Sequence, residues 1–83
     1  MRDHRKLIEA GTNAQIEKLV LNNHKPPLNL ATPGYCKTRI LQEMGELLKA
    51  STPAEMRLEA ADIANFCHAL IWWCDRNIKQ ESI

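Results

Sequence analysis

The sequence predicts an all-α fold, namely an antiparallel bundle of three to four helices that is completed by oligomerisation. Three observations support this prediction. Apolar residues recur at helical intervals along most of the chain, no stretch alternates as a strand would, and two Thr-Pro pairs mark helix starts. Residues 1–83 are expected to form one small domain, whose hydrophobic core is marginal if the chain stands alone.

The first helix is expected over residues 2–22. Gly11-Thr12-Asn13 interrupts its apolar pattern, which leaves open one kinked helix or two short ones. The prolines at positions 26 and 27 end this helix, because proline lacks an N–H donor and forces extended geometry on the preceding residue. Residues 28–31 should then form an ordered loop anchored by Leu28 and Leu30.

The second and third helices each begin at a Thr-Pro pair. Thr32 is the expected cap of a helix that runs to about Ala50, and Thr52, with Glu55 in a capping box, begins one that runs to about Ile78. The short loop between them makes these helices antiparallel neighbours. The apolar stripe expected at the interface of the third helix comprises Met56, Ala60, Ile63, Cys67, Leu70, Ile71, Cys74 and Ile78, with Phe66 and Trp73 on one flank.

Composition argues against several classes of protein. Charged residues form 25% of the chain at a net charge of +1, so bulk electrostatics favour neither a nucleic-acid nor a membrane-surface partner. The apolar stretches are too short to span a bilayer, and no signal-type run follows the N-terminus, which predicts a cytoplasmic protein. Cys36, Cys67 and Cys74 lack CxxC spacing and are expected to be reduced and buried, with a zinc site involving His68 as the alternative.

Two carboxylate pairs carry the functional signal. Glu43-x-x-Glu46 lies on the second helix, and Glu59-x-x-Asp62 follows after twelve residues on the third. Helical geometry places Glu43 and Glu59 toward the interface and their partners at its rim, at matching height in an antiparallel hairpin. Four converging carboxylates in a partly dry cleft need a counter-charge, and oxygen ligands suit a hard divalent ion. We therefore expect these four residues to hold Mg²⁺, or Mn²⁺, unless they form a solvated acidic face.

The segment from Ile40 to Leu70 also carries a family resemblance. Its sequences QEMGELLKA and EAADIANFCHAL resemble the acidic helices of the MazG-like all-α nucleoside triphosphate pyrophosphohydrolases, and HKPPLNLA resembles a His-x-Pro-x-Asn-Leu segment upstream of them. The resemblance implies Mg²⁺-dependent hydrolysis of a (deoxy)nucleoside triphosphate to the monophosphate and pyrophosphate. Glu46, at the rim of the second helix, is the candidate catalytic residue that orients the attacking water.

Four further residues are candidates for substrate binding. Asn65, one turn beyond Asp62, is placed to bond the sugar or base, and Lys37 and Arg39 precede the acidic pair and could reach phosphates. The resemblance adds His24. The competing interpretation is a non-catalytic helical module for oligomerisation or regulatory interaction, in which Trp72-Trp73 would anchor a partner. Both interpretations predict a homodimer or homotetramer, because the core is small.

Overall fold

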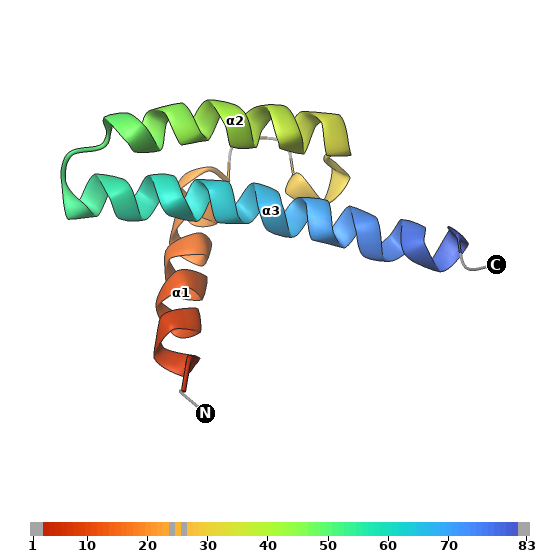
Figure 1. Cartoon of the computed structure of the whole chain (residues 1–83), viewed down its shortest axis with the longest axis horizontal. Coiled ribbons are helices and arrows are strands. Elements are labelled where there is room, and N and C mark those ends of the chain that lie inside the picture. The colour runs from red at the N-terminus through yellow and green to blue at the C-terminus, as the bar shows by residue number, and fades with distance from the viewer. Residues whose placement is uncertain (1–2, 24, 26, 82–83) are drawn as a thin grey trace.

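The computed structural model describes residues 3–23, 25 and 27–81, with side chains as far as Ile78. Three α-helices and one short 3₁₀ turn form this part of the chain, and it contains no strand (Figure 1). The elements are α1 (Arg5–Leu21), η1 (Leu28–Leu30), α2 (Pro33–Lys49) and α3 (Pro53–Glu81). The all-α prediction is therefore confirmed.

The first helix is continuous. Gly11, Thr12 and Asn13 all lie inside α1, and no described residue has a positive φ. A single glycine costs a helix only about 1 kcal/mol relative to alanine, so the surrounding helix formers carry the chain through it. The structure thus selects one helix over two short ones.

Both Thr-Pro helix starts are confirmed. The Thr32 Oγ1 accepts a hydrogen bond from the Tyr35 N–H at 3.3 Å, and the Thr52 Oγ1 accepts one from the Glu55 N–H at 3.1 Å. The Thr52 hydroxyl also donates to the Glu55 carboxylate at 2.9 Å. Only residues 50–52 join α2 to α3, so the two helices run antiparallel and side by side (Figure 1).

The face that α3 turns inward differs from the predicted one. Its buried residues are Ala61, Asp62, Asn65, Phe66 and Ala69, whereas Met56, Ala60, Ile71 and Ile78 of the predicted stripe are exposed. The reason is α1, which packs against the more polar side of α3 and turns that side into the interior. Half of the predicted stripe consequently lies on the outside of the single chain, whereas Ile63, Cys67, Leu70 and Cys74 are half-buried. Leu30 is also exposed, so only Leu28 anchors the turn that precedes α2.

The first helix crosses α3 steeply instead of joining an antiparallel bundle (Figure 1). Side-chain amides make the contact: the Gln15 Nε2 donates to the Asn65 Oδ1 at 3.2 Å, and the Asn65 Nδ2 donates to the Gln15 carbonyl at 3.1 Å. The Gln15 Nε2 also lies 2.9 Å from the His68 Nδ1. Outside this network, Arg57 pairs with Glu17 at 2.7 Å. Polar bonds therefore orient α1 over the α2–α3 hairpin.

The three cysteines are free thiols. Cys36 is fully buried between α2 and α3, whereas Cys67 and Cys74 are half-buried. Burial, and secondly the neighbouring Cys67, raises the pKa of the Cys36 thiol, which keeps it protonated and unreactive. Among the described residues, none of the helices is both long and apolar enough to cross a membrane.

Candidate metal centre and adjoining cavity

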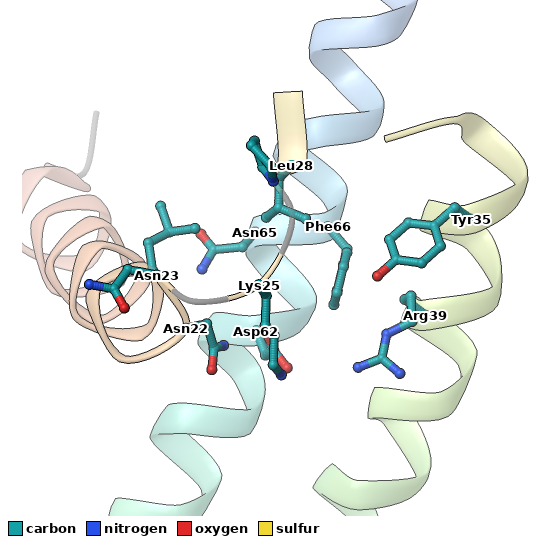
Figure 2. A pocket seen from close by; sticks show the side chains of 11 residues that line it. Asn22, Asn23, Lys25, Leu28, Tyr35, Arg39, Asp62, Asn65 and Phe66 are labelled. Atoms are coloured by element: carbon teal, nitrogen blue, oxygen red, sulfur yellow. The ribbon is translucent and has the colours of Figure 1, made fainter. Parts of the chain in front are cut away.

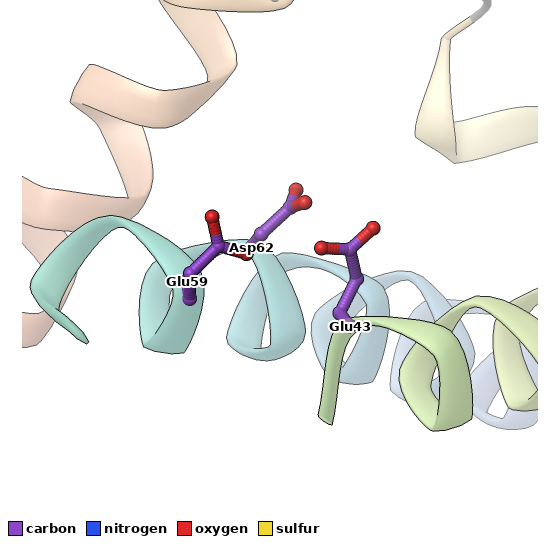
Figure 3. Close-up of side chains that lie close together, drawn as sticks. All are labelled: Glu43, Glu59 and Asp62. Carbon is purple, nitrogen blue, oxygen red and sulfur yellow. The ribbon is translucent and has the colours of Figure 1, made fainter. Parts of the chain in front are cut away.

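Three of the four predicted acids meet at one point. Glu43 of α2 and Glu59 and Asp62 of α3 each place a carboxylate oxygen within 4.8 Å of the other two (Figure 3). Their positions follow from the antiparallel hairpin, which sets the last turns of α2 beside the first turns of α3. Glu43 and Asp62 are each only 8% exposed, and Glu59 is half-buried.

The surroundings of Asp62 disfavour the charged form of its carboxyl group. Burial raises the pKa of the Asp62 carboxyl, the charge of Glu43 raises it further, and the positive charges of Lys18 and Lys25 offset part of this shift. The side-chain contact of Asp62 is with another acid, since a hydrogen bond shared with the Glu43 carboxyl also raises its pKa. A buried carboxylate next to another acid costs free energy, which a cation placed beside it would recover.

Glu43 does have a cationic partner. The Arg39 Nη2 lies 2.7 Å from the Glu43 Oε1, one turn earlier on α2. The guanidinium also donates to the Gln42 Oε1 at 2.8 Å and lies over the Phe66 ring, 5.5 Å from its centroid. Arg39 forms an ion pair with Glu43, and Lys18 and Lys25 offset only part of the cost of charge on Asp62. The all-oxygen donor set is the kind that Mg²⁺ and Mn²⁺ prefer.

Glu46 lies apart from the group. Its side chain is 58% exposed, and its Oε1 is 4.0 Å from the Lys49 Nζ at the end of α2. An ion pair of that length on an open surface contributes little to stability. Glu46 is therefore available to solvent at the edge of the cluster, one helical turn from Glu43.

A cavity of about 260 Å³ adjoins the acids between α1, the turn that carries η1, and the α2–α3 hairpin (Figure 2). The head groups of Lys25, Arg39 and Asp62 lie at one end of it, and the rings of Tyr35 and Phe66 lie above them. These two rings pack edge to face, with centroids 6.1 Å apart and planes at 73°. The cavity is lined by Leu19, Asn22, Asn23, Lys25, Pro27, Leu28, Tyr35, Arg39, Asp62, Asn65 and Phe66.

The predicted substrate-binding residues are divided by the structure. Arg39 and Asn65 line the cavity, although the Asn65 amide is already bonded to Gln15 on both its oxygen and its nitrogen. Lys37 is exposed on α2 and is not part of the cavity wall. His24 lies outside the described residues. Asn29 of the resembling segment is exposed.

The sequence patterns missed several cavity residues. Lys25 and the amides of Asn22 and Asn23 come from the segment after α1, which was interpreted only as a helix stop. Tyr35, in the first turn of α2, was not assigned a role. One signal was present for the ion pair: Arg39 and Glu43 stand four apart on a helix, a spacing at which opposite charges pair.

Comparisons with protein-family models, with curated proteins and with solved structures found no match.

Proposed function

We propose that this chain is a Mg²⁺-dependent nucleoside triphosphate pyrophosphohydrolase, which converts a (d)NTP and water into a (d)NMP and pyrophosphate. The observation that carries the proposal is that an acidic cluster adjoins a cavity of about 260 Å³, which is lined by both cationic and aromatic residues. The resemblance of QEMGELLKA and EAADIANFCHAL to the MazG-like family agrees with it.

The charges of the cavity suit a triphosphate. Lys25 and Arg39 lie at the end that Asp62 shares with the acidic cluster, so phosphate oxygens placed there would find donors and positive charge (Figure 2). Tyr35 and Phe66 offer aromatic surface for the base, and Asn22 and Asn23 offer amides for its polar edge. The charged and the aromatic parts of a nucleotide thus each have matching residues.

The acids of the cluster would bind the divalent cation that the reaction needs. Glu43, Glu59 and Asp62 would hold a divalent ion, with Glu46 as a further ligand at the rim. Mg²⁺ or Mn²⁺ bound there supplies a Lewis acid that offsets phosphate charge and lowers the pKa of a water. Glu46, the exposed acid, would orient the water that attacks the α-phosphorus. A bond forms between the water oxygen and the α-phosphorus, and the bond between the α-phosphorus and the α–β bridging oxygen breaks. That oxygen leaves with pyrophosphate, and the proton of the water passes to Glu46 and then to solvent.

A panel of ribo- and deoxynucleoside triphosphates with Mg²⁺ tests this function directly. We expect pyrophosphate release from at least one member, and loss of release by about 100-fold or more in Glu59→Gln, since removing even an outer partner of a metal ligand costs 10- to 100-fold. Glu9→Gln is the matched control, because Glu9 is an exposed acid on α1 outside the cluster. Silence across the panel with both Mg²⁺ and Mn²⁺ would contradict the proposal and favour a non-catalytic helical module.

An exposed apolar surface on α2 and α3 supports the proposal that the chain forms a homodimer or homotetramer. Leu41, Met44 and Leu48 of α2, and Met56, Ile71 and Ile78 of α3, are all large and exposed. On helical geometry, these residues lie on the side of the hairpin that faces away from α1. A second α2–α3 hairpin packed there would complete a four-helix bundle.

A further inference from the structure

The Arg39 side chain stands between the acidic cluster and the cavity. Its Nη2 binds the Glu43 carboxylate at 2.7 Å, and the same side chain lines the cavity wall beside Asp62 (Figure 2). Its Nε is buried and has no hydrogen-bond partner among the described residues. A buried donor without an acceptor is unfavourable, so one of its five N–H bonds is left to be satisfied by something outside the described residues.

The Glu43 carboxylate already accepts a hydrogen bond from one cation. The oxygen that accepts from Arg39 belongs to one of the three carboxylates that converge within 4.8 Å. A divalent ion bound by these carboxylates would meet the guanidinium at close range, where like charges repel strongly in a partly buried site. Asp62, 8% exposed, faces the same cluster from α3, and Lys18 and Lys25 offset only part of the cost of its charge, so the acids are incompletely compensated while Arg39 holds Glu43.

A triphosphate in the cavity offers Arg39 another partner. Guanidinium groups bind phosphate through paired N–H bonds, a geometry that also employs Nε. The stack on Phe66 leaves the guanidinium plane in place while its edge changes acceptor. When the Arg39 guanidinium moves to the phosphate, it would thus release Glu43 and at the same time give its Nε donor an acceptor.

We propose that Arg39 is an exchangeable counter-cation: it neutralises Glu43 in the nucleotide-free protein and transfers to phosphate when a polyphosphate occupies the cavity, which frees Glu43 for the divalent ion. This inference rests on the proposed function for the identity of the two ligands. It assigns Arg39 opposite effects on them, since it opposes the ion in the absence of phosphate and supports the binding of phosphate. A residue that only supported the fold would weaken both.

Two isotherms on the intact protein test the exchange. In the first, Mn²⁺ alone is titrated into protein without nucleotide, at 0.15 M salt so that exposed charges beyond about 8 Å are screened. We expect Arg39→Gln to bind Mn²⁺ more tightly than wild type by about 5- to 150-fold, the usual range for coupled sites. In the second, inorganic tripolyphosphate is titrated in the presence of EDTA, and Arg39→Gln should bind it about tenfold or more weakly.

Arg57→Gln is the matched control, because Arg57 also forms a 2.7 Å ion pair with a glutamate but outside the cluster. It should shift both isotherms much less than Arg39→Gln does. Arg39→Met, which retains packing on Phe66, replaces the glutamine variant if circular dichroism shows that the latter is not folded. Unchanged or weaker Mn²⁺ binding in a folded Arg39 variant overturns the exchange, even if the protein hydrolyses nucleotides. Tighter Mn²⁺ binding and weaker tripolyphosphate binding support it, even if no nucleotide is hydrolysed.

Discussion

The Asp62 carboxylate is held in a place that penalises its charge. Burial is the first cause and Glu43 the second, and both raise the pKa of Asp62 above its value in the unfolded chain. Folding of the metal-free protein therefore gains most from this group below the unfolded pKa, near 3.8, and loses that contribution as the pH rises through the folded pKa. At neutral pH the charge on Asp62 thus lowers the stability of the metal-free protein, and a cation bound beside it should restore that stability.

Replacing Asp62 by asparagine should stabilise the metal-free protein. Asp62→Asn keeps the shape of the side chain, removes the buried charge, and adds an amide N–H₂ that can donate to Glu43. We expect a higher Tm than wild type at pH 7 in EDTA, and a difference that vanishes below pH 3.8; each kcal/mol would appear as about 4–8 °C for a domain of this size.

Asp75→Asn provides the control, since Asp75 is an exposed acid on the same helix. Its Tm at pH 7 should stay close to that of wild type. Addition of Mn²⁺ should reverse the order, stabilising wild type and leaving Asp62→Asn unchanged. An asparagine variant that is less stable than wild type in EDTA would show that Asp62 has a favourable partner in the folded state.

The amide network sets the position of α1 at the scale of the element. Asn65 and Gln15 are both buried and bond each other twice across the α1–α3 contact. Asn65→Ala removes a second hydrogen bond from the Gln15 carbonyl, which keeps its bond within α1, and leaves one N–H of the buried Gln15 Nε2 without an acceptor, at a cost of about 1–3 kcal/mol. Urea unfolding should show this loss, whereas Asn13→Ala, at an exposed position in the middle of α1, should stay within about 0.5 kcal/mol of wild type. Equal stability of the two variants would mean that apolar contacts, not the amides, position α1.

Local chemistry explains which elements could be predicted. Thr32 and Thr52 mark helix starts because a cap bond involves only neighbours in the chain, and the structure contains both bonds. The rotation of α3 was not predictable in this way. Its apolar stripe suggested one inward face, but the approach of α1 buries Asp62 and Asn65 instead. That approach depends on Gln15, fifty residues from Asn65, and no local pattern encodes such a contact.

The candidate site shows the same division. The i,i+3 spacing of each acidic pair and the short α2–α3 connection are local features, and they predicted that the acids lie at matching height, as Glu43, Glu59 and Asp62 do. They did not predict that Asp62, expected at the rim, is more deeply buried than Glu59. The cavity requires the segment after α1 to fold back over the hairpin, so Lys25 and Tyr35 emerged only in three dimensions. Sequence reasoning thus found most of the acids and few of the residues around them.

The whole chain exposes too much surface for its mass. Its accessible area is 6631 Å², whereas a compact monomer of 9.5 kDa exposes about 5,000 Å². Its radius of gyration is 14.3 Å, against about 12 Å for a compact domain of this length. The excess area of roughly 1,600 Å² per chain exceeds the roughly 800 Å² that each partner buries in a standard protein interface. The surplus is therefore large enough for a stable homo-oligomer.

The apolar face away from α1 is where that surplus should be buried. We expect sedimentation to show a dimer or tetramer, and Leu48→Glu or Ile71→Glu to shift it toward monomer and to lower its Tm, because each places a charge on a surface that a second hairpin would cover. Leu7→Glu is the matched control, since Leu7 is an exposed leucine on α1. If Leu7→Glu dissociates the oligomer while the other two variants do not, α1 forms the interface instead. A wild-type monomer at all concentrations would show that this small core folds alone. It would contradict the proposal that a second α2–α3 hairpin packs on this face.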